Sequence, residues 1–357
     1  MTCNTDASGL PPERFITDPA KLDHYSRDAT PGISCRPEAV CLPKTVAEVE
    51  SVLKWAFSEK IPVTCRGAGT GNSGGAIPVQ KGLVLSLEKL NRILEVDVDN
   101  RVARVEPGVI TEHLQNRVLE EGLFYPPDPA SLSVCTIGGN VAENAGGPRA
   151  VKYGVTKDYV IGLAGFFVNG EPFKFGGKQY KNVAGYDLIR LLVGSEGTLG
   201  VITEVTVRLL SNPPVTQDLI VGFPDYQTAL RGMRTVLTSS ITPAVVEFMD
   251  AYCVTVTARY LEIPVPVKSA SVYLLFQQDG SSVGNVLDQI EKIRSLCDSS
   301  GAIFSRVLEG ETCQSVWRVR REISRALKDL SPNKIAQDVV VPPAEIPDFM
   351  SYLKALG

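Results

Sequence analysis

The spacing of apolar residues in the first half of the chain predicts short elements around glycine-rich segments. Residues 45–60 carry apolar side chains at helical intervals, and Thr45 with Glu48 forms a candidate capping box at the start. The next stretch, IPVTCR at 61–66, is short and partly β-branched, which predicts a brief or edge strand. Another apolar run, LVLSL, follows at 83–87. We therefore expect a helix, a short strand and a glycine-rich connection that leads to this apolar run.

Beyond the proline-rich segment SNPPVTQD at 211–218, strands and helices alternate regularly. Strands are expected at 218–223, 244–250, 271–278 and 302–308, and amphipathic helices at 225–239, 251–262, 283–300 and 311–330. This order is typical of an α+β plait with helices over one face of the sheet. The change of pattern predicts a second domain.

The composition is that of a soluble globular protein, because 357 residues with 44% hydrophobic content suffice for two buried cores. The formal net charge of -4 and the scattered basic residues argue against a nucleic-acid partner. The chain shows neither an apolar run of about 18 residues nor a signal-peptide pattern at its start. We therefore expect no transmembrane segment and a cytoplasmic location, and attachment to a membrane through a partner stays open. The eight cysteines are dispersed without a C-x-x-C pair, which predicts reduced thiols rather than a zinc or iron–sulfur site.

The stretch RGAGTGNSGG at 66–75 raises the question of a nicotinamide site. Gly69, Gly71 and Gly74 have the G-x-G-x-x-G spacing of a dinucleotide-binding turn, and Glu88 follows as a candidate ribose ligand. That motif requires the third glycine to open a helix. Because the next apolar run begins soon after Gly74, no crossover helix fits between them. The spacing match is therefore interpreted as accidental, and Glu88 loses its assigned role.

Two further glycine clusters follow, at 133–147 and 194–210. Glycines in strand-forming sequence permit positive φ angles and close backbone approach, so that successive N–H groups converge on an anion. Three such loops in one domain suggest a large ligand. Each loop taken alone is equally compatible with a simple hairpin turn.

Four segments together resemble one protein family, in this order along the chain: RGAGTGNSGG, PPDPASLSVCTIGGNVAENAGGPRAVKYG, YKNVAGYDLIRLLVGSEGTLGVITEV and the late VWRVRREI…KIAQDVVVP. The family comprises the flavin-linked oxidases of the p-cresol methylhydroxylase fold. The similar branch includes the glycolate dehydrogenase flavoprotein subunit, D-lactate dehydrogenase and D-2-hydroxyglutarate dehydrogenase. The resemblance implies an α+β protein with a two-subdomain FAD-binding domain at 35–211, after an N-terminal extension at 1–34. A ferredoxin-like α+β cap domain is implied at 212–357.

The resemblance also implies that FAD lies along all three glycine clusters. The first cluster would wrap the pyrophosphate, the second would follow the ribityl chain and flavin ring, and the third would approach the adenine half. The implied contacts are Arg66, Gly67, Ala68, Gly69, Thr70, Gly71, Asn72, Ser73, Asp128, Ser131, Thr136, Gly138, Gly139, Asn140, Asn144, Gly147, Gly197, Gly200, Val201 and Ile202. Many relatives attach FAD through a histidine in or near the first loop. Because His24 and His113 both lie outside that loop, we expect non-covalent FAD and two ordinary surface or helix-face histidines.

On the substrate side, the resemblance implies that the cap binds a small 2-hydroxy acid. Arg320 would bind the substrate carboxylate through its planar fork of donors, and Ser324 and Lys334 match two further substrate-facing positions. The alternative is that the arginines of this helix form a solvated face. That interpretation is kept for Arg318, Arg321 and Arg325.

The reaction implied is oxidation of glycolate or D-lactate to the 2-oxo acid, with an iron–sulfur or other electron-transfer subunit as a partner. The family's H-x-G-D-G-N type segment, which supplies a metal site and a histidine, does not occur in this sequence. No catalytic base and no metal ligand are therefore assigned. We expect the cap to be C-terminally incomplete, with altered chemistry as the other explanation. The alternative function is a flavin-binding accessory subunit that oxidises no substrate itself, and a nicotinamide dehydrogenase is a third, weaker hypothesis.

Overall fold

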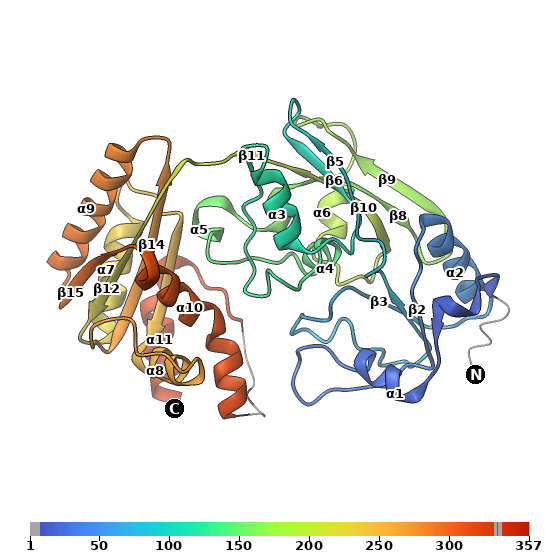
Figure 1. Cartoon of the computed structure of the whole chain (residues 1–357), viewed down its shortest axis with the longest axis horizontal. Coiled ribbons are helices and arrows are strands. Elements are labelled where there is room, and N and C mark those ends of the chain that lie inside the picture. Colours follow the sequence, from blue (N-terminus) through green and yellow to red (C-terminus); the bar gives the residue numbers. More distant parts are fainter. Residues whose placement is uncertain (1–7, 332–333, 335–337, 357) are drawn as a thin grey trace. The chain divides into compact units, whose positions relative to one another are not determined.

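The computed structural model describes residues 8–331, 334 and 338–356. The chain divides into two compact units (Figure 1). The first unit contains Met1–Gly147 and Gly154–Asn212, and the second contains Pro148–Tyr153 and Pro213–Gly357. A short segment in the middle of the sequence therefore belongs to the second unit. Over the described residues, none of the helices is both long and apolar enough to span a bilayer.

The first unit begins with a four-stranded sheet in the order β1-β2-β4-β3. Its strands are β1 (Phe15–Ile16), β2 (Ala39–Cys41), β3 (Val63–Arg66) and β4 (Leu83–Ser86). β3 is an edge strand, as the sequence predicts, and it pairs in parallel with β4. Parallel neighbours require a long connection, and here the glycine-rich segment between β3 and β4 provides it without a helix. The absence of a helix there confirms that the G-x-G-x-x-G spacing is accidental.

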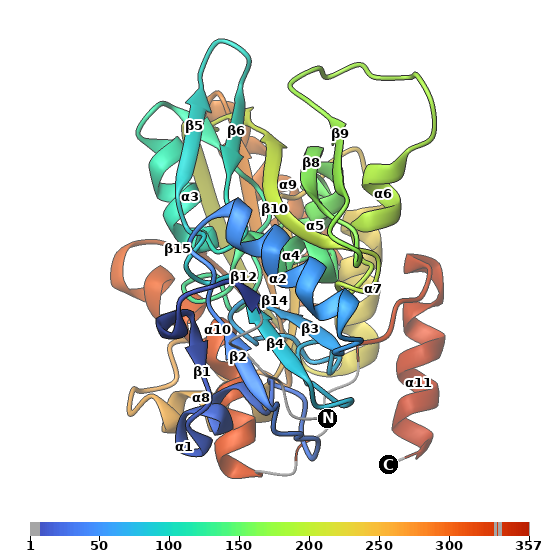
Figure 2. The ribbon, with the colours of Figure 1, turned by 90° about the vertical axis from the view of Figure 1, so that its right-hand side faces the viewer.

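Helix α2 (Val46–Ser58) packs its apolar face against this sheet (Figure 2). The hydroxyl oxygen of Thr45 accepts a hydrogen bond from the Glu48 amide at 3.2 Å, which confirms the predicted N-cap. The Glu48 carboxylate also forms an ion pair with Arg14 at 3.0 Å. The helix thus fixes the position of the strand that leads into the glycine-rich loop.

The second sheet of this unit is antiparallel, in the order β5-β6-β10-β8-β9. Its strands are β5 (Ile93–Asp97), β6 (Val102–Val105), β8 (Val160–Phe166), β9 (Pro172–Gly176) and β10 (Val201–Arg208). A long loop separates β9 from α6 (Figure 2). The remaining elements are η2 (Pro12–Arg14), α1 (Pro19–Leu22), η3 (Asp23–Tyr25), α3 (Thr111–Leu119), α4 (Ile137–Glu143), η4 (Thr156–Asp158), α6 (Leu188–Leu192) and the paired β7 (Leu123–Phe124) and β11 (Leu210–Ser211).

The second unit is built on an antiparallel sheet in the order β13-β14-β12-β15. Its elements are β12 (Val215–Phe223), α7 (Tyr226–Leu237), β13 (Val245–Asp250), α8 (Ala251–Tyr260), β14 (Val272–Gly280), α9 (Val283–Ser299), β15 (Phe304–Leu308), α10 (Gly310–Leu330), η5 (Pro343–Glu345) and α11 (Ile346–Leu356). With α8 set aside, the order of strands and helices is that of a ferredoxin-like plait, as expected.

The prediction that helices cover one face of this sheet is wrong, because both faces are covered. Leu274 and Phe276 of β14 pack in a core with α7 and α9, whereas Tyr273 and Leu275 pack in another core with α8 and α10. α9 and α10 accordingly lie on opposite faces of the sheet (Figure 1). Alternate residues of a strand point to opposite faces, so a continuous apolar run requires cover on both sides.

The segment that the second unit takes from the middle of the sequence ends in helix α5 (Ala150–Tyr153). Lys152 forms an ion pair with the buried Asp279 at the end of β14. The Tyr153 hydroxyl donates a hydrogen bond to the same carboxylate at 2.8 Å. This charged contact explains why the segment groups with the second unit.

Candidate functional site

The first glycine cluster is a loop built around the side chain of Arg66. The Arg66 side chain is buried, and its guanidinium donates hydrogen bonds to the carbonyl oxygens of Arg27 at 2.8 Å and of Ala76 and His24, each at 3.4 Å. Gly69 has a φ of 68°, and a Cβ atom there would overlap the guanidinium. Burial lowers the pKa of Arg66. The guanidinium therefore shapes the loop, and the backbone N–H groups are what the loop offers to a ligand.

The second glycine cluster was expected to be a loop, but it forms the short helix α4. The Thr136 hydroxyl oxygen accepts a hydrogen bond from the Gly139 amide at 3.2 Å and so caps the helix. Gly138 packs against Pro107, where a Cβ atom would lie 2.5 Å from the proline Cβ. Gly67 of the first loop lies against Thr136, because a side chain there would overlap the hydroxyl. These glycines therefore permit close packing inside and beside a helix.

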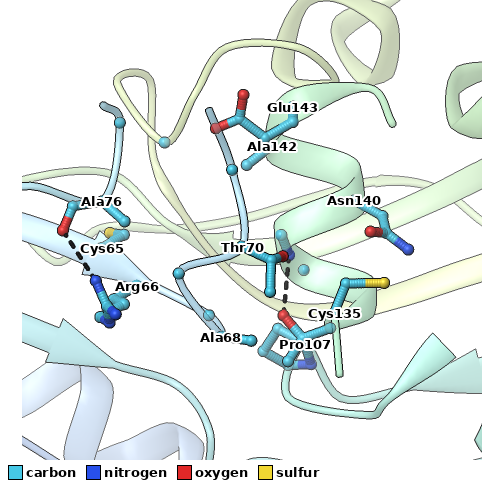
Figure 3. A pocket seen from close by; sticks show the side chains of 18 of the residues that line it. Cys65, Arg66, Ala68, Thr70, Ala76, Pro107, Cys135, Asn140, Ala142 and Glu143 are labelled. Atoms are coloured by element: carbon cyan, nitrogen blue, oxygen red, sulfur yellow. Dashed lines mark hydrogen bonds between the residues drawn. The ribbon is translucent and has the colours of Figure 1, made fainter. Parts of the chain in front are cut away.

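The third glycine cluster is hydrogen-bonded to the end of α4. The Gly194 amide donates to the Val141 carbonyl oxygen and the Glu196 amide to the Ala142 carbonyl oxygen, each at 2.9 Å. Gly197 approaches the end of β3, since a Cβ atom there would lie 3.5 Å from the Cys65 Cβ. All three clusters therefore meet at one place. Figure 3 shows Arg66 hydrogen-bonded to the Ala76 carbonyl oxygen on one side of the first loop, and Asn140, Ala142 and Glu143 of helix α4 on the other side.

A cavity of about 180 Å³ lies where the clusters meet. Fifteen of the twenty cofactor residues implied by the family resemblance line it: Arg66, Gly67, Ala68, Gly69, Thr70, Gly71, Ser131, Thr136, Gly138, Gly139, Asn140, Gly197, Gly200, Val201 and Ile202. Cavities that hold small molecules measure roughly 300–1,000 Å³. This cavity therefore accommodates a part of a dinucleotide rather than the whole of it.

The other five predicted residues fall outside the lining of this cavity among the described residues. The Ser73 hydroxyl donates a hydrogen bond to Glu143 at 2.9 Å, and Asn72 is exposed. Asn144 ends α4 in the left-handed conformation, where its side-chain oxygen accepts from the Lys157 amide at 2.9 Å.

Asp128 and Gly147 pack together. Asp128 is buried, and a Cβ atom on Gly147 would overlap the Asp128 carbonyl oxygen. The structure therefore gives both residues a role in bringing the segments around the second glycine cluster close together.

Several residues that the sequence did not single out also line the cavity: Asp28, Cys65, Gly75, Ala76, Leu87, Pro107, Pro129, Cys135, Ala142, Glu143, Ala145, Ser195 and Glu196. Nine of them lie within two positions of a predicted residue, so their proximity to the motifs is a usable signal. Asp28 is different, because it comes from the N-terminal segment. The Ala29 amide beside it donates to the Gly71 carbonyl oxygen at 3.0 Å, a contact that no local pattern indicates.

The cavity carries more negative than positive side chains. Partial burial raises the pKa of Glu143, the neighbouring charges of Glu196 and Asp28 raise it further, and the hydrogen bond from Ser73 opposes the rise. Among the described lining residues, Arg66 is the only lysine or arginine, and its guanidinium binds carbonyl oxygens of the loop. An anionic ligand group must therefore be bound by backbone N–H groups, and the carboxylates suit hydroxyl or amino donors.

A second cavity of about 440 Å³ shares Arg66, Gly67, Ala68 and Thr136 with the first. It is also lined by both histidines of the chain, His24 and His113, which are exposed. Glu88 lies there as well, and its carboxylate accepts hydrogen bonds from the Ser86 hydroxyl at 3.1 Å and the Tyr25 hydroxyl at 3.3 Å. Glu88 therefore binds its own protein neighbours.

In the second unit, the predicted substrate residues lie close together on α10 and just after it. Arg320 and Ser324 are one helical turn apart. The Lys334 ammonium donates to the Ser324 hydroxyl oxygen at 3.0 Å and to its carbonyl oxygen at 3.3 Å. The Arg320 Nε donates to Glu247 at 2.5 Å.

The neighbouring arginines of α10 make contacts of a different kind. Arg325 is exposed and pairs with Glu322 at 3.1 Å. The Arg321 guanidinium lies 5.6 Å from the centre of the Trp317 ring. Arg318 is exposed.

Within the described residues, His, Cys, Asp and Glu side chains form no group of three or more that could hold a metal ion. Seven of the eight cysteines lie in the described part of the chain, and these seven are free thiols. Burial raises the pKa of Cys65, which lines the cavity, to about 12. The protonated form of this thiol is therefore favoured at neutral pH.

The chain combines a first unit that contains a cavity lined by three glycine clusters with a second, ferredoxin-like unit. A solved structure of p-cresol methylhydroxylase with bound substrate matches 89% of this chain and 69% of its own, with a TM-score of 0.72 and 20% identity. A structure of alkyldihydroxyacetonephosphate synthase matches 98% of this chain and 73% of its own, with a TM-score of 0.78 and 18% identity. These likenesses confirm the predicted fold.

The family follows from the sequence matches. Residues 37–176 match the FAD binding domain model, and residues 212–357 match the model of the C-terminal domain of FAD linked oxidases. The chain belongs to the FAD-linked oxidases. It is an FAD-linked oxidoreductase.

Curated relatives cover nearly the whole chain. The glycolate oxidase subunit GlcD of Bacillus subtilis (strain 168) is 40% identical over 97% of this chain and 73% of its own length. A D-lactate dehydrogenase of Anaerostipes hadrus is 36% identical over 90% of this chain and 69% of its own. A D-2-hydroxyglutarate dehydrogenase of Xanthomonas citri pv. viticola is 33% identical over 97% of this chain and 73% of its own. The chain therefore spans 69–73% of the length of these three relatives.

The cavity fits FAD chemically. Eight of its lining residues are glycines, so that backbone N–H groups can approach a pyrophosphate closely. Its carboxylates offer acceptors for hydroxyl and amino groups, which FAD carries in its sugar and adenine parts.

Proposed function

We propose that the protein oxidises a small 2-hydroxy acid, glycolate or D-lactate, to the corresponding 2-oxo acid. The observation that carries this proposal is the group formed by Arg320, Ser324 and Lys334. Arg320 and Ser324 lie one turn apart on α10, and the Lys334 ammonium is hydrogen-bonded to the Ser324 hydroxyl. The names of the relatives support it, because glycolate, D-lactate and D-2-hydroxyglutarate are all 2-hydroxy acids.

In this proposal, the first loop and the residues that line the first cavity hold FAD without a covalent bond. When bound, FAD supplies the acceptor for the hydride that leaves the substrate Cα. Arg320 binds the substrate carboxylate, since a guanidinium offers two parallel charge-assisted hydrogen bonds. Ser324 and Lys334 contact the substrate beside it. Their task is to orient the Cα–H bond, and such positioning lowers the barrier substantially.

A second function is supported by the name of the Bacillus subtilis relative, a glycolate oxidase subunit. In that alternative the protein binds FAD within a complex, with an electron-transfer subunit as partner, and oxidises no substrate itself. The two functions differ in whether the isolated flavoprotein is reduced by a 2-hydroxy acid.

The test is anaerobic reduction of the purified, FAD-loaded protein by glycolate, D-lactate and D-2-hydroxyglutarate, followed by the loss of flavin absorbance. We expect bleaching by glycolate or D-lactate. Replacement of Arg320 by Lys should raise the KM about tenfold or more, because hydrogen bonds between charged groups are lost. The matched control is Arg325→Lys on the same helix, which should leave KM unchanged because Arg325 is exposed and paired with Glu322. Bound FAD without bleaching by any of the three acids would favour the accessory subunit.

A further inference from the structure

Glu247 faces α10 because of its register in β13. Val246 and Phe248 pack in the core that contains α7 and α9, whereas Met249 packs with Val316 of α10. Successive residues of a strand alternate between faces, so Glu247 shares the face of Met249. The strand therefore places one carboxylate under α10.

That carboxylate meets the proposed substrate arginine. The Arg320 Nε donates to the Glu247 Oε2 at 2.5 Å, and the two side chains are 27% and 13% exposed. A carboxylate with this little exposure requires a charged or hydrogen-bonding partner, and Arg320 provides it. The contact joins strand β13 to α10 across 73 residues of sequence.

A guanidinium is planar, so one hydrogen bond constrains the direction of all its donors. A carboxylate bound to Nε fixes the plane of the Arg320 guanidinium. The terminal N–H donors then cannot rotate freely about the bond that joins the guanidinium to the rest of the side chain. Lysine has no such plane, and its ammonium would be held only as a point charge. Glu247 thus has the position and the chemistry to orient Arg320.

We propose that Glu247 is a positioning residue, which holds the Arg320 guanidinium in the orientation that binds the carboxylate of the 2-hydroxy acid. This inference rests on the proposed function, because it requires Arg320 to bind the substrate. It assigns Glu247 no contact with the reacting atoms. Its loss should therefore weaken substrate binding more than it slows the chemical step.

The experiment compares Glu247→Gln and Glu247→Asp with the wild-type FAD-loaded protein. Glu247→Gln should raise the KM for the 2-hydroxy acid about tenfold with little change in kcat, and should leave the FAD Kd unchanged. Glu247→Asp keeps the charge and should recover part of the loss. The matched control is Glu322→Gln, which breaks the ion pair with the exposed Arg325 on the same helix and should leave KM unchanged.

The double variant Glu247→Gln/Arg320→Lys should have nearly the same KM as Arg320→Lys alone, because the two residues act through one contact. The inference is overturned if Glu247→Gln lowers kcat by the same factor by which it raises KM, and if Glu247→Asp restores neither constant. That result would assign the ion pair to stability. If Arg320→Lys raises KM and neither Glu247 variant does, only the inference about Glu247 is wrong. If Arg320→Lys also leaves KM unchanged, the substrate role of Arg320 in the proposed function is wrong as well.

Discussion

Arg66 is 5% exposed. Among the described residues, its guanidinium donates hydrogen bonds to three carbonyl oxygens and to no carboxylate. A buried cation is costly unless its donors are satisfied, and here three carbonyl oxygens satisfy them. The loop must bend around the guanidinium, which explains the glycine with positive φ beside it. The shape of the glycine loop, and with it the access of a ligand to the backbone N–H groups, therefore depends on the hydrogen bonds of one side chain, Arg66.

A glycine substitution tests this dependence. Gly69→Ala should lower the free energy of unfolding by more than Gly74→Ala and should weaken FAD binding. Both positions have positive φ, which costs roughly 1–2 kcal/mol for a residue with a Cβ atom. Only Gly69 lies against the guanidinium, while a Cβ atom on Gly74 would meet nothing within 4 Å. Denaturant unfolding and FAD titration of both variants measure the difference. Equal losses in the two variants would contradict a role for Arg66 in shaping the loop.

Strand β12 shows how a buried polar residue connects elements of the second unit. Asp218 accepts hydrogen bonds from Gln277 of β14 and Trp317 of α10, each at 3.0 Å. Burial raises the pKa of Asp218, and these hydrogen bonds oppose the rise. The carboxyl group therefore binds its proton more tightly in the folded chain than in the unfolded chain.

This shift predicts a pH dependence at the scale of elements. Because the folded-state pKa of Asp218 is raised, its contribution to stability is complete at acidic pH and is lost as pH rises through the raised value. In Asp218→Asn, the free energy of unfolding should therefore fall less between pH 4 and pH 8 than in the wild type. Urea unfolding at a series of pH values measures this. Asp225, the N-cap of α7, is the opposite case, because hydrogen bonds from Thr228 lower its pKa. Asp225→Asn should instead reduce the loss of stability at acidic pH. The same slope in Asp218→Asn and wild type would show that Asp218 titrates normally.

At the scale of the whole molecule, the covalent state of the cofactor is open to a direct test. Neither His24 nor His113 lines the first cavity, as far as its described lining residues show. We predict that acid or heat denaturation releases all the flavin into the supernatant and leaves a colourless precipitate. Absorbance of the two fractions measures this. Flavin retained by the precipitated chain would contradict the prediction and would indicate a covalent attachment.

The elements were largely predictable from sequence, because helix and strand periodicities are local. The N-cap at Thr45, the edge strand β3 and the alternating elements of the second unit all follow from spacing and capping residues. The errors have physical causes. The glycines at 138 and 139 favoured a loop, but the cap at Thr136 and close packing against Pro107 support a helix. The unbroken apolar run of β14 indicates cover on two faces, whereas the order of strands and helices does not reveal how many faces are covered.

The sequence by itself determined the family, the cofactor and the order of the elements, because these are carried by long motifs and by the periodicity of neighbouring residues. Only the tertiary structure decided which side chains meet. Asp28 joins the glycine loop from the N-terminal segment, and Glu247 meets Arg320 from a distant strand. Contacts of this kind depend on sheet register and on the packing of helices against the sheet, and neither leaves a periodic signal along the chain.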